Sequence, residues 1–180
     1  MKVTTISLLA GSVLTLGMTA ASANDVYCSD YGGLINEHVN DKVIADVDCT
    51  IGMDGYVDND IEADGKSVTV FGTVNGNIKQ WGRKGVAVDG GSVDGNIEEK
   101  DAGGVSIALA EDDSINGDVK EEGPGNVIAV IDGLFNGNIS EKGRGDLKTS
   151  GDGMFNGNTK EENRGKCSNT IEYFDGNACE

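Results

Sequence analysis

A five-residue motif that returns at intervals of about 20 residues is the feature that most constrains this chain. Each copy places two apolar residues four positions apart, around a central residue that is usually Gly. The copies begin at Val74, Val93, Ile115, Phe135 and Phe155, with a last one at Phe174. The interval from one start to the next is therefore nearly constant. Repetition with this period is typical of solenoids, in which successive coils stack and bury one another.

The spacing within each repeat indicates β-strands. After Val74 and Ile78, a third apolar position follows eight residues later at Val86, and alternation then continues to Val88. Alternation with a period of two is a strand signal, and no period of 3.6 residues is present. The sequence therefore predicts an all-β fold, a parallel β-solenoid (β-helix) of about 7–8 coils with roughly 20 residues each. The residues predicted to point inward, side by side in neighbouring coils, are Val74, Ile78, Val86 and Val88 with Val93, Ile97, Val105 and Ile107.

The chain divides into four segments. Residues 1–23 combine an early Lys, an apolar stretch and the small residues Ala21-Ser22-Ala23, a pattern typical of a bacterial secretory signal peptide cleaved after Ala23. Residues 24–56 are predicted to form an N-terminal cap and an irregular first coil. Residues 57–166 hold the solenoid repeats, and 167–180 form a C-terminal end coil or cap. We therefore expect a secreted protein, extracellular or at the cell surface, with the periplasm as the alternative.

Four cysteines in an exported chain imply disulfides, and three pairings are possible. Cys28 and Cys49 lie near one end of the repeats, and Cys167 and Cys179 near the other. Some eight coils at about 4.8 Å each separate the two ends by more than about 30 Å. A disulfide spans only about 6 Å between Cα atoms, so we predict Cys28–Cys49 and Cys167–Cys179. A metal site is the alternative, but the chain has no C-x-x-C motif and only one histidine, His38.

Composition and motifs argue against several functions. The net charge of −17 disfavours binding to nucleic acid and to anionic membranes. A single histidine, the lack of a G-x-S-x-G element and the short connections between repeats offer no catalytic site or pocket. We therefore expect no enzyme activity, no catalytic or metal-binding residues and no cofactor, apart from weak Ca²⁺ binding as an open alternative.

One acidic column bears on that alternative. It follows the second apolar residue of each repeat by two positions. Its members are Gln80, Glu99, Glu121, Glu141 and Glu161. The favoured interpretation is a solvated edge whose glutamates pair with adjacent lysines. The alternative is a shallow Ca²⁺ ladder, because hard cations bind carboxylate oxygens. The lysines in question are Lys79, Lys100, Lys120, Lys142 and Lys160.

Two further columns mark a corner of each coil. The central residue of the motif is Asp41, Asn59, Gly76, Gly95, Gly117, Gly137, Gly157 and Gly176 in successive coils. Gly, Asn and Asp enter the left-handed region most readily, which predicts a corner with positive φ. The flanking asparagines are expected to form side-chain ladders. They are Asn75, Asn116, Asn136 and Asn156 on one side, and Asn77, Asn96, Asn138 and Asn158 on the other.

The segment 78–88, I-K-Q-W-G-R-K-G-V-A-V, resembles one repeat of the curlin subunits of bacterial amyloid fibres. In those repeats a strand ending in Gln passes through a Gly-rich turn into a second strand, and residues 121–126 are similar to that turn. The apolar-x-Gly-x-apolar stacking is also similar to bactofilin-type polymer-forming solenoids. These resemblances imply stacked coils and, for the curlins, assembly into fibres.

Together these features favour an exported, non-enzymatic structural or surface-interaction protein, of the kind found in extracellular matrices or among adhesins. Its partners would be cell-surface or matrix components, or further copies of itself. A self-assembling fibre subunit is the first alternative. An acidic cation-binding module is the second.

Overall fold

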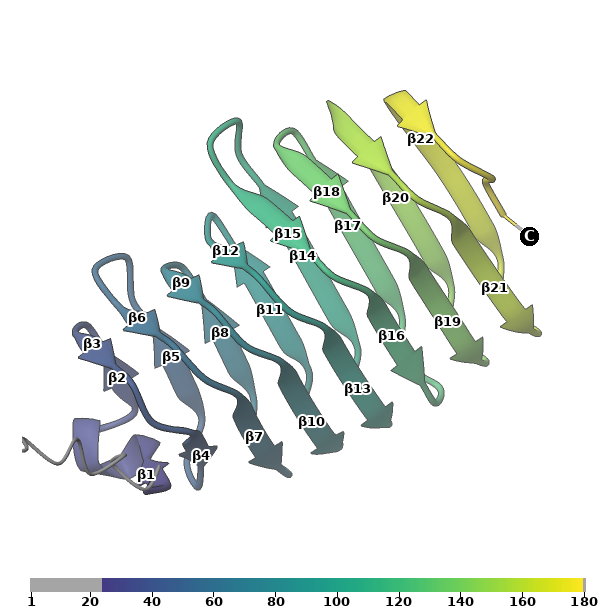
Figure 1. Ribbon diagram of the computed structural model, residues 1–180. Coiled ribbons are helices and arrows are strands. Elements are labelled where there is room, and N and C mark those ends of the chain that lie inside the picture. Colours follow the sequence, from purple (N-terminus) through teal and green to yellow (C-terminus); the bar gives the residue numbers. More distant parts are fainter. Residues whose placement is uncertain (1–23, 180) are drawn as a thin grey trace, which may run out of the picture.

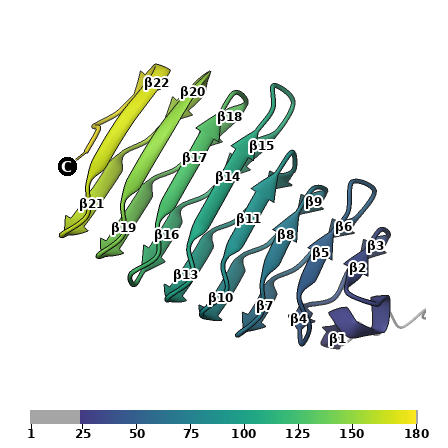
Figure 2. The same cartoon turned by 180° about the vertical axis from the view of Figure 1, so that it is seen from behind.

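The computed structural model describes residues 24–179 of the 180-residue chain. The predicted signal peptide, residues 1–23, lies outside the described residues. The described chain is an all-β parallel β-solenoid of about eight coils, with one short 3₁₀ helix, η1 (Cys28–Tyr31). The coils stack along a single axis and place the two ends of the described segment at opposite ends of the stack (Figure 1; Figure 2 shows the reverse side). The predicted fold class is confirmed.

Each coil contributes one strand to an 8-stranded sheet, and the first six coils each contribute two strands, and the last two coils one long strand each, to a 14-stranded sheet. The 8-stranded sheet contains β1 (Val26–Tyr27), β4 (Val43–Ala45), β7 (Ile61–Asp64), β10 (Ile78–Gly82), β13 (Ile97–Asp101), β16 (Val119–Glu122), β19 (Ile139–Gly143) and β21 (Thr159–Asn163). Every pair within it is parallel.

The 14-stranded sheet has two columns of strands, which merge at its C-terminal end. The first column is β2 (Leu34–Ile35), β5 (Cys49–Ile51), β8 (Val68–Val70), β11 (Val86–Asp89), β14 (Val105–Leu109) and β17 (Val127–Ile131). The second is β3 (His38–Val39), β6 (Tyr56–Val57), β9 (Thr73–Val74), β12 (Ser92–Val93), β15 (Ser114–Asn116) and β18 (Leu134–Asn136). The long strands β20 (Leu147–Asn156) and β22 (Cys167–Asp175) run through both columns.

The register follows the sequence repeat. Ile78 pairs with Ile97 in the 8-stranded sheet, and Val74 pairs with Val93 in the other. Coil length varies slightly along the stack, and the longest step joins Ile97 to its partner Val119. The eight residues predicted to point inward are all buried and pair coil to coil as expected. Parallel pairing in register stacks like residues on like, which gives each coil the same small apolar core.

The core is a narrow stack of aliphatic side chains that widens near the C-terminal end. Along each strand buried and outward residues alternate, as in Val105–Leu109. Full burial of one Val, Ile or Leu side chain contributes about 1.5–3 kcal/mol. Phenylalanines take over one inward column at Phe135 and Phe155, whose side chains have no exposed surface.

The glycines of the repeated motif are required by close approach of coils. A Cβ atom at Gly95 would lie 2.3 Å from the carbonyl oxygen of Gly76, and one at Gly117 would lie 2.2 Å from that of Gly95. The backbone at these three glycines is not left-handed, and the same holds at Asn59 and Asp41. Only the glycines of the last three copies, Gly137, Gly157 and Gly176, have positive φ, at 152–157°. The predicted corner with positive φ is therefore found in three of the eight coils, whereas close contact between coils is common to all the motif glycines.

Candidate functional site

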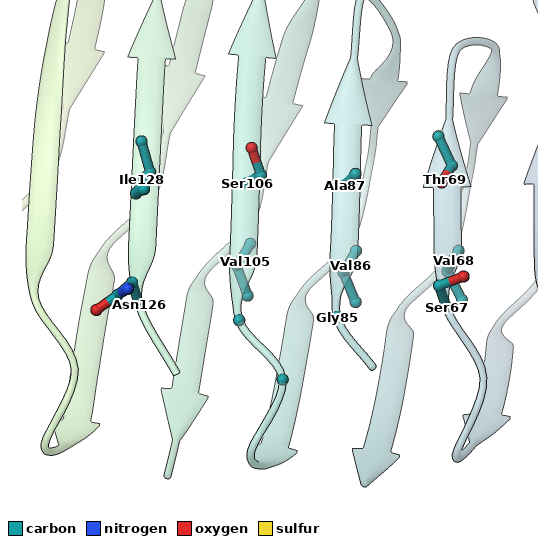
Figure 3. Close-up of a pocket in the computed structure, with 12 residues that line it drawn as sticks. Ser67, Val68, Thr69, Gly85, Val86, Ala87, Val105, Ser106, Asn126 and Ile128 are labelled. Atoms are coloured by element: carbon teal, nitrogen blue, oxygen red, sulfur yellow. The ribbon is translucent and has the colours of Figure 1, made fainter. Parts of the chain in front are cut away.

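A shallow groove crosses the outer face of the 14-stranded sheet. It has a volume of about 420 Å³ and runs over β8, β11, β14 and β17 (Figure 3). Its floor is a row of outward side chains, one from each strand: Thr69, Ala87, Ser106 and Ile128. One edge is formed by the turns that precede these strands, which contribute Ser67, Gly85, Gly103, Gly104 and Asn126.

The groove is electrically neutral, which sets it apart from the rest of the surface. None of the twelve described residues that line it is charged, in a chain whose composition is 25% charged. The outer face of the 8-stranded sheet is different, because it carries ion pairs such as Lys100–Glu98 at 2.9 Å and Lys160–Glu162 at 2.8 Å. The two faces therefore suit different partners, and the groove suits an uncharged one.

The acidic column lies inside the solenoid, contrary to the favoured sequence interpretation. Gln80, Glu99, Glu121 and Glu141 have no exposed surface, and only the last member, Glu161, is partly exposed. Their strands alternate with a period of two, so a residue two positions after a buried Ile or Val must also point inward. Four of the five lysines named above pair with other carboxylates: Lys79 with Asp60, Lys100 with Glu98, Lys120 with Glu122, and Lys160 with Glu162. The prediction of a solvated edge was wrong.

One oxygen of each inward glutamate accepts a backbone hydrogen bond from a glycine four residues later. The N–H groups of Gly103, Gly125 and Gly145 donate to Oε1 of Glu99, Glu121 and Glu141, each at 3.0 Å. Gly165 and Glu161 repeat the contact at 2.9 Å. Glycine is needed in the turn because a Cβ at Gly125 would lie 1.8 Å from the carbonyl oxygen of Gly103, and 2.7 Å from Oε1 of Glu121.

The other oxygen, Oε2, has no donor group on it in any of these four glutamates. The register places each carboxyl group next to that of the following coil, in the order Glu99, Glu121, Glu141 and Glu161, with Gln80 before the first of them. Loss of solvation on burial raises the pKa of Glu121 to about 7, with its neighbour Glu99 adding to the rise. Burial also raises the pKa of Glu161 to about 7, and it raises the pKa of Glu99 and of Glu141 above the usual range.

The two asparagine columns form ladders along the corner, as predicted, although only part of each ladder joins amide to amide. The Nδ2 group of Asn136 donates to Oδ1 of Asn116 at 2.9 Å, and Asn156 donates to Asn136 at 2.7 Å. In the second column, side-chain oxygens mainly accept from backbone N–H groups of the next coil, as Asn96 does from Asp118 at 2.8 Å. These contacts tie successive corners together.

The cysteines pair within each end of the solenoid, in the two pairs expected from the sequence. Cys28 is bonded to Cys49 with Cα atoms 5.9 Å apart, and Cys167 to Cys179 with Cα atoms 5.4 Å apart. The first bond joins η1 to β5. The second joins the start of β22 to the C-terminal segment. Two disulfides indicate a non-reducing environment, extracellular or periplasmic.

The single histidine contacts an aspartate and a tyrosine of the next coil. Nε2 of His38 lies 2.7 Å from Oδ2 of Asp58, and the ring packs edge-on against Tyr56. Within residues 24–179, no three His, Cys, Asp or Glu side chains are arranged to hold a metal ion. The described part of the chain also has no helix with the length and apolar character needed to span a membrane.

Comparison of the chain with protein-family models, with curated proteins and with solved structures finds no match in any of the three.

Proposed function

We propose that this protein is an exported, non-enzymatic structural protein that holds an uncharged component of a cell surface or extracellular matrix against the outer face of its 14-stranded sheet. The observation that carries the proposal is the neutral groove over β8, β11, β14 and β17. Burying a charged group without a partner lowers the binding affinity, because the group loses its solvation. A partner that docks in this groove buries no charged side chain of the protein and avoids that cost. The strands that form the face are fixed by coil stacking on both sides, so little ordering entropy is lost on contact.

The signal-like segment 1–23 and the two disulfides support export. Cell fractionation of the producing bacterium tests this part, with immunodetection in cytoplasm, periplasm, envelope and medium. Recovery of the reduced protein from the cytoplasm alone would contradict it.

Binding is tested by co-sedimentation of the oxidised protein with purified cell envelopes and with matrix polysaccharide. Ile128→Lys places a charge in the groove, and the fold tolerates it because Lys148 already occupies the same column one coil further on. Ser140→Lys is the matched control, because Ser140 lies in an outward column of the 8-stranded sheet between Lys120 and Lys160. We expect Ile128→Lys to lower sedimentation at least tenfold and Ser140→Lys to leave it unchanged. Equal binding by both variants would exclude the groove.

A second candidate, self-assembly into fibres, is favoured by the C-terminal end. The nine-residue strand β22 pairs with β20 and with no further strand among the described residues. Met154 and Tyr173, which are register partners, are more than half exposed there. An uncovered strand edge recruits further strands. Electron microscopy of the purified protein separates the two candidates, because fibres are expected only for the second.

A further inference from the structure

The inward glutamates have no counter-ion inside the solenoid. Glu99, Glu121 and Glu141 are fully buried, and the other buried polar residues within 24–179 are Gln80, Thr149 and Thr159. No basic side chain accompanies them into the core. An ionised carboxylate without a buried partner is so costly that such groups take up a proton instead.

The geometry of the column favours protons over metal ions. The four glutamates are register partners from one coil to the next, so their inward carboxyl groups stack at the strand spacing of about 4.8 Å. Two ionised carboxylates at this distance repel, whereas one proton between them makes a hydrogen bond. A metal ion would need several oxygens placed around it, and the Oε1 atoms are already occupied by the glycine N–H groups.

The surroundings of the column reinforce this. The charged groups that act on its two ends are acidic as well, Asp101 near Glu99 and Asp146 near Glu161. On the same strands Lys100, Lys120 and Lys160 pair with outward glutamates, and Lys142 is exposed. On the facing strands β14, β17 and β20 the buried residues are aliphatic apart from Thr149 and Phe155, and those of β15 and β18 are Ile115 and Phe135. The column therefore has no cationic neighbour in the core.

We infer that Glu99, Glu121, Glu141 and Glu161 form a proton-binding ladder, in which hydrogen-bonded carboxylic acid groups hold successive coils together and the coils loosen as these protons leave. The following Gly of each E-x-x-x-G segment belongs to the same device. It leaves room for the backbone carbonyl oxygen of the preceding coil, which a Cβ would meet, and it supplies an N–H donor to Oε1. Gln80, the one uncharged amide in the column, is followed at that position by Lys84, and its Nε2 donates instead to the carbonyl oxygen of Trp81 at 2.8 Å.

The direction of the pH effect follows from proton linkage. An ordinary glutamate has a pKa of 4.5, whereas burial raises the pKa of Glu121 and Glu161 to about 7. Between these values the folded chain binds protons that the unfolded chain has lost. The stabilisation is therefore complete below about pH 4.5 and is lost as the pH rises through about 7.

Surface carboxylates act in the opposite direction, but at lower pH. Hydrogen bonds from Ser29 lower the pKa of Asp46, those from Ser67 lower the pKa of Asp48, and His38 lowers the pKa of Asp58. The stability that these groups contribute is present above the ordinary aspartate pKa of 3.8 and is lost below it. From about pH 5 to about pH 8 the interior ladder therefore determines how stability changes with pH, and stability falls as the pH rises.

Thermal and urea unfolding of the oxidised protein from about pH 5 to about pH 8 tests the ladder. We expect the melting temperature to fall as the pH rises. Glu121→Gln and Glu141→Gln should each flatten this dependence and melt above the wild type at the alkaline end. Glu98→Gln is the matched control, because Glu98 precedes Glu99 on β13 and points outward, and its profile should parallel the wild type. A wild-type profile that is flat or rises with pH, or one that Glu98→Gln flattens equally, would overturn the proposal.

Infrared spectroscopy gives a second readout that does not require the variants to be stable. At neutral pH the wild type should keep the carbonyl band of a protonated carboxylic acid, which disappears from the spectrum on unfolding. Its absence would contradict the ladder. A third experiment measures the melting temperature at alkaline pH with added calcium or magnesium chloride. A rise for the wild type but not for Glu121→Gln would show that the column binds cations instead of protons.

Discussion

Phe155 stacks on Phe135 inside the solenoid, with ring centroids 4.8 Å apart and ring planes 6° from parallel. Phe174 continues the column, with its centroid 5.0 Å from that of Phe155. Aromatic pairs that are free to move prefer offset or edge-to-face contact. Here the parallel strands impose the stack, because residues in register lie directly above one another at about 4.8 Å.

Phe155→Ala is expected to lower the free energy of unfolding by about 3–5 kcal/mol, because it removes the middle ring of the column and leaves a cavity. Urea unfolding followed by circular dichroism measures the change. Met154→Ala is the control from the same strand, and since that side chain is 53% exposed, its loss should cost about 0.5 kcal/mol or less. Equal losses would show that Phe155 does not pack as described.

Two glycine substitutions distinguish close approach from backbone conformation. Gly95→Asn should destabilise by about 3 kcal/mol or more, because its Cβ would collide with the carbonyl oxygen of Gly76. Gly65→Asn should cost less than about 1 kcal/mol, because Gly65 has φ of +66° with open space around it and Asn tolerates that region. The melting temperatures of both variants show which of the two explanations holds for the glycine of the motif. A mild effect at Gly95 would contradict close approach of the coils as the reason for glycine at this position.

Opening the N-terminal disulfide should destabilise the folded chain by about 3 kcal/mol, because it closes a loop between residues 21 apart in sequence. The paired substitution Cys28→Ser with Cys49→Ser, measured by urea unfolding, tests this. Non-reducing peptide mapping of the wild type should find Cys28 with Cys49 and Cys167 with Cys179. A peptide that links the two ends would be incompatible with a linear solenoid.

The oxidised protein is expected to be monomeric at low salt, where its net charge of −17 opposes contact between copies. The segment after β22 lies against β21, where the N–H of Thr159 donates to the carbonyl oxygen of Asn177 at 2.9 Å. The double variant Cys167→Ser with Cys179→Ser releases this segment and exposes the edge of β21, so it should promote assembly. Light scattering across salt concentrations follows this. Rapid fibre growth by the oxidised wild type at low salt would instead favour the fibre candidate.

The coil register could be predicted from sequence because three independent signals agree. The four-residue and eight-residue spacings recur in each copy, and alternation fixes which residues face inward. Ile97, for example, is fixed as buried by its spacing from Val93 and from Val105. The disulfides follow from the same geometry, since a linear stack brings together only cysteines at the same end.

The glutamate column was misplaced because charge was given more weight than alternation. Glu99 follows the buried Ile97 by two positions, which by itself requires an inward side chain. The earlier coils carry the confirming signal, since Ala45 and Ala63 occupy the same column and are buried. What the sequence could not supply was the partner for each carboxyl group, a backbone N–H four residues away.

The glycine column shows a different limit. Asn59 and Asp41 in the early coils suggested a conformational role, because these residues share with Gly a tolerance of positive φ. The distance between corners of neighbouring coils is a tertiary property, and no local pattern reports it. Only the stacked structure shows that each later corner lies against the carbonyl group of the one before it.

The bond between Cys167 and Cys179 has a mechanical consequence. A solenoid pulled at its C-terminus would ordinarily peel from that end, one strand at a time. Here tension applied beyond Cys179 passes through the sulfur atoms directly to Cys167, so that β22 lies within a closed loop and carries almost none of the load. The force therefore enters the chain at Cys167, shortly after β21, which pairs with β19, while the neighbouring strand β20 pairs with β17. A protein built in this way resists being unravelled from its free end by shear or by a processive protease.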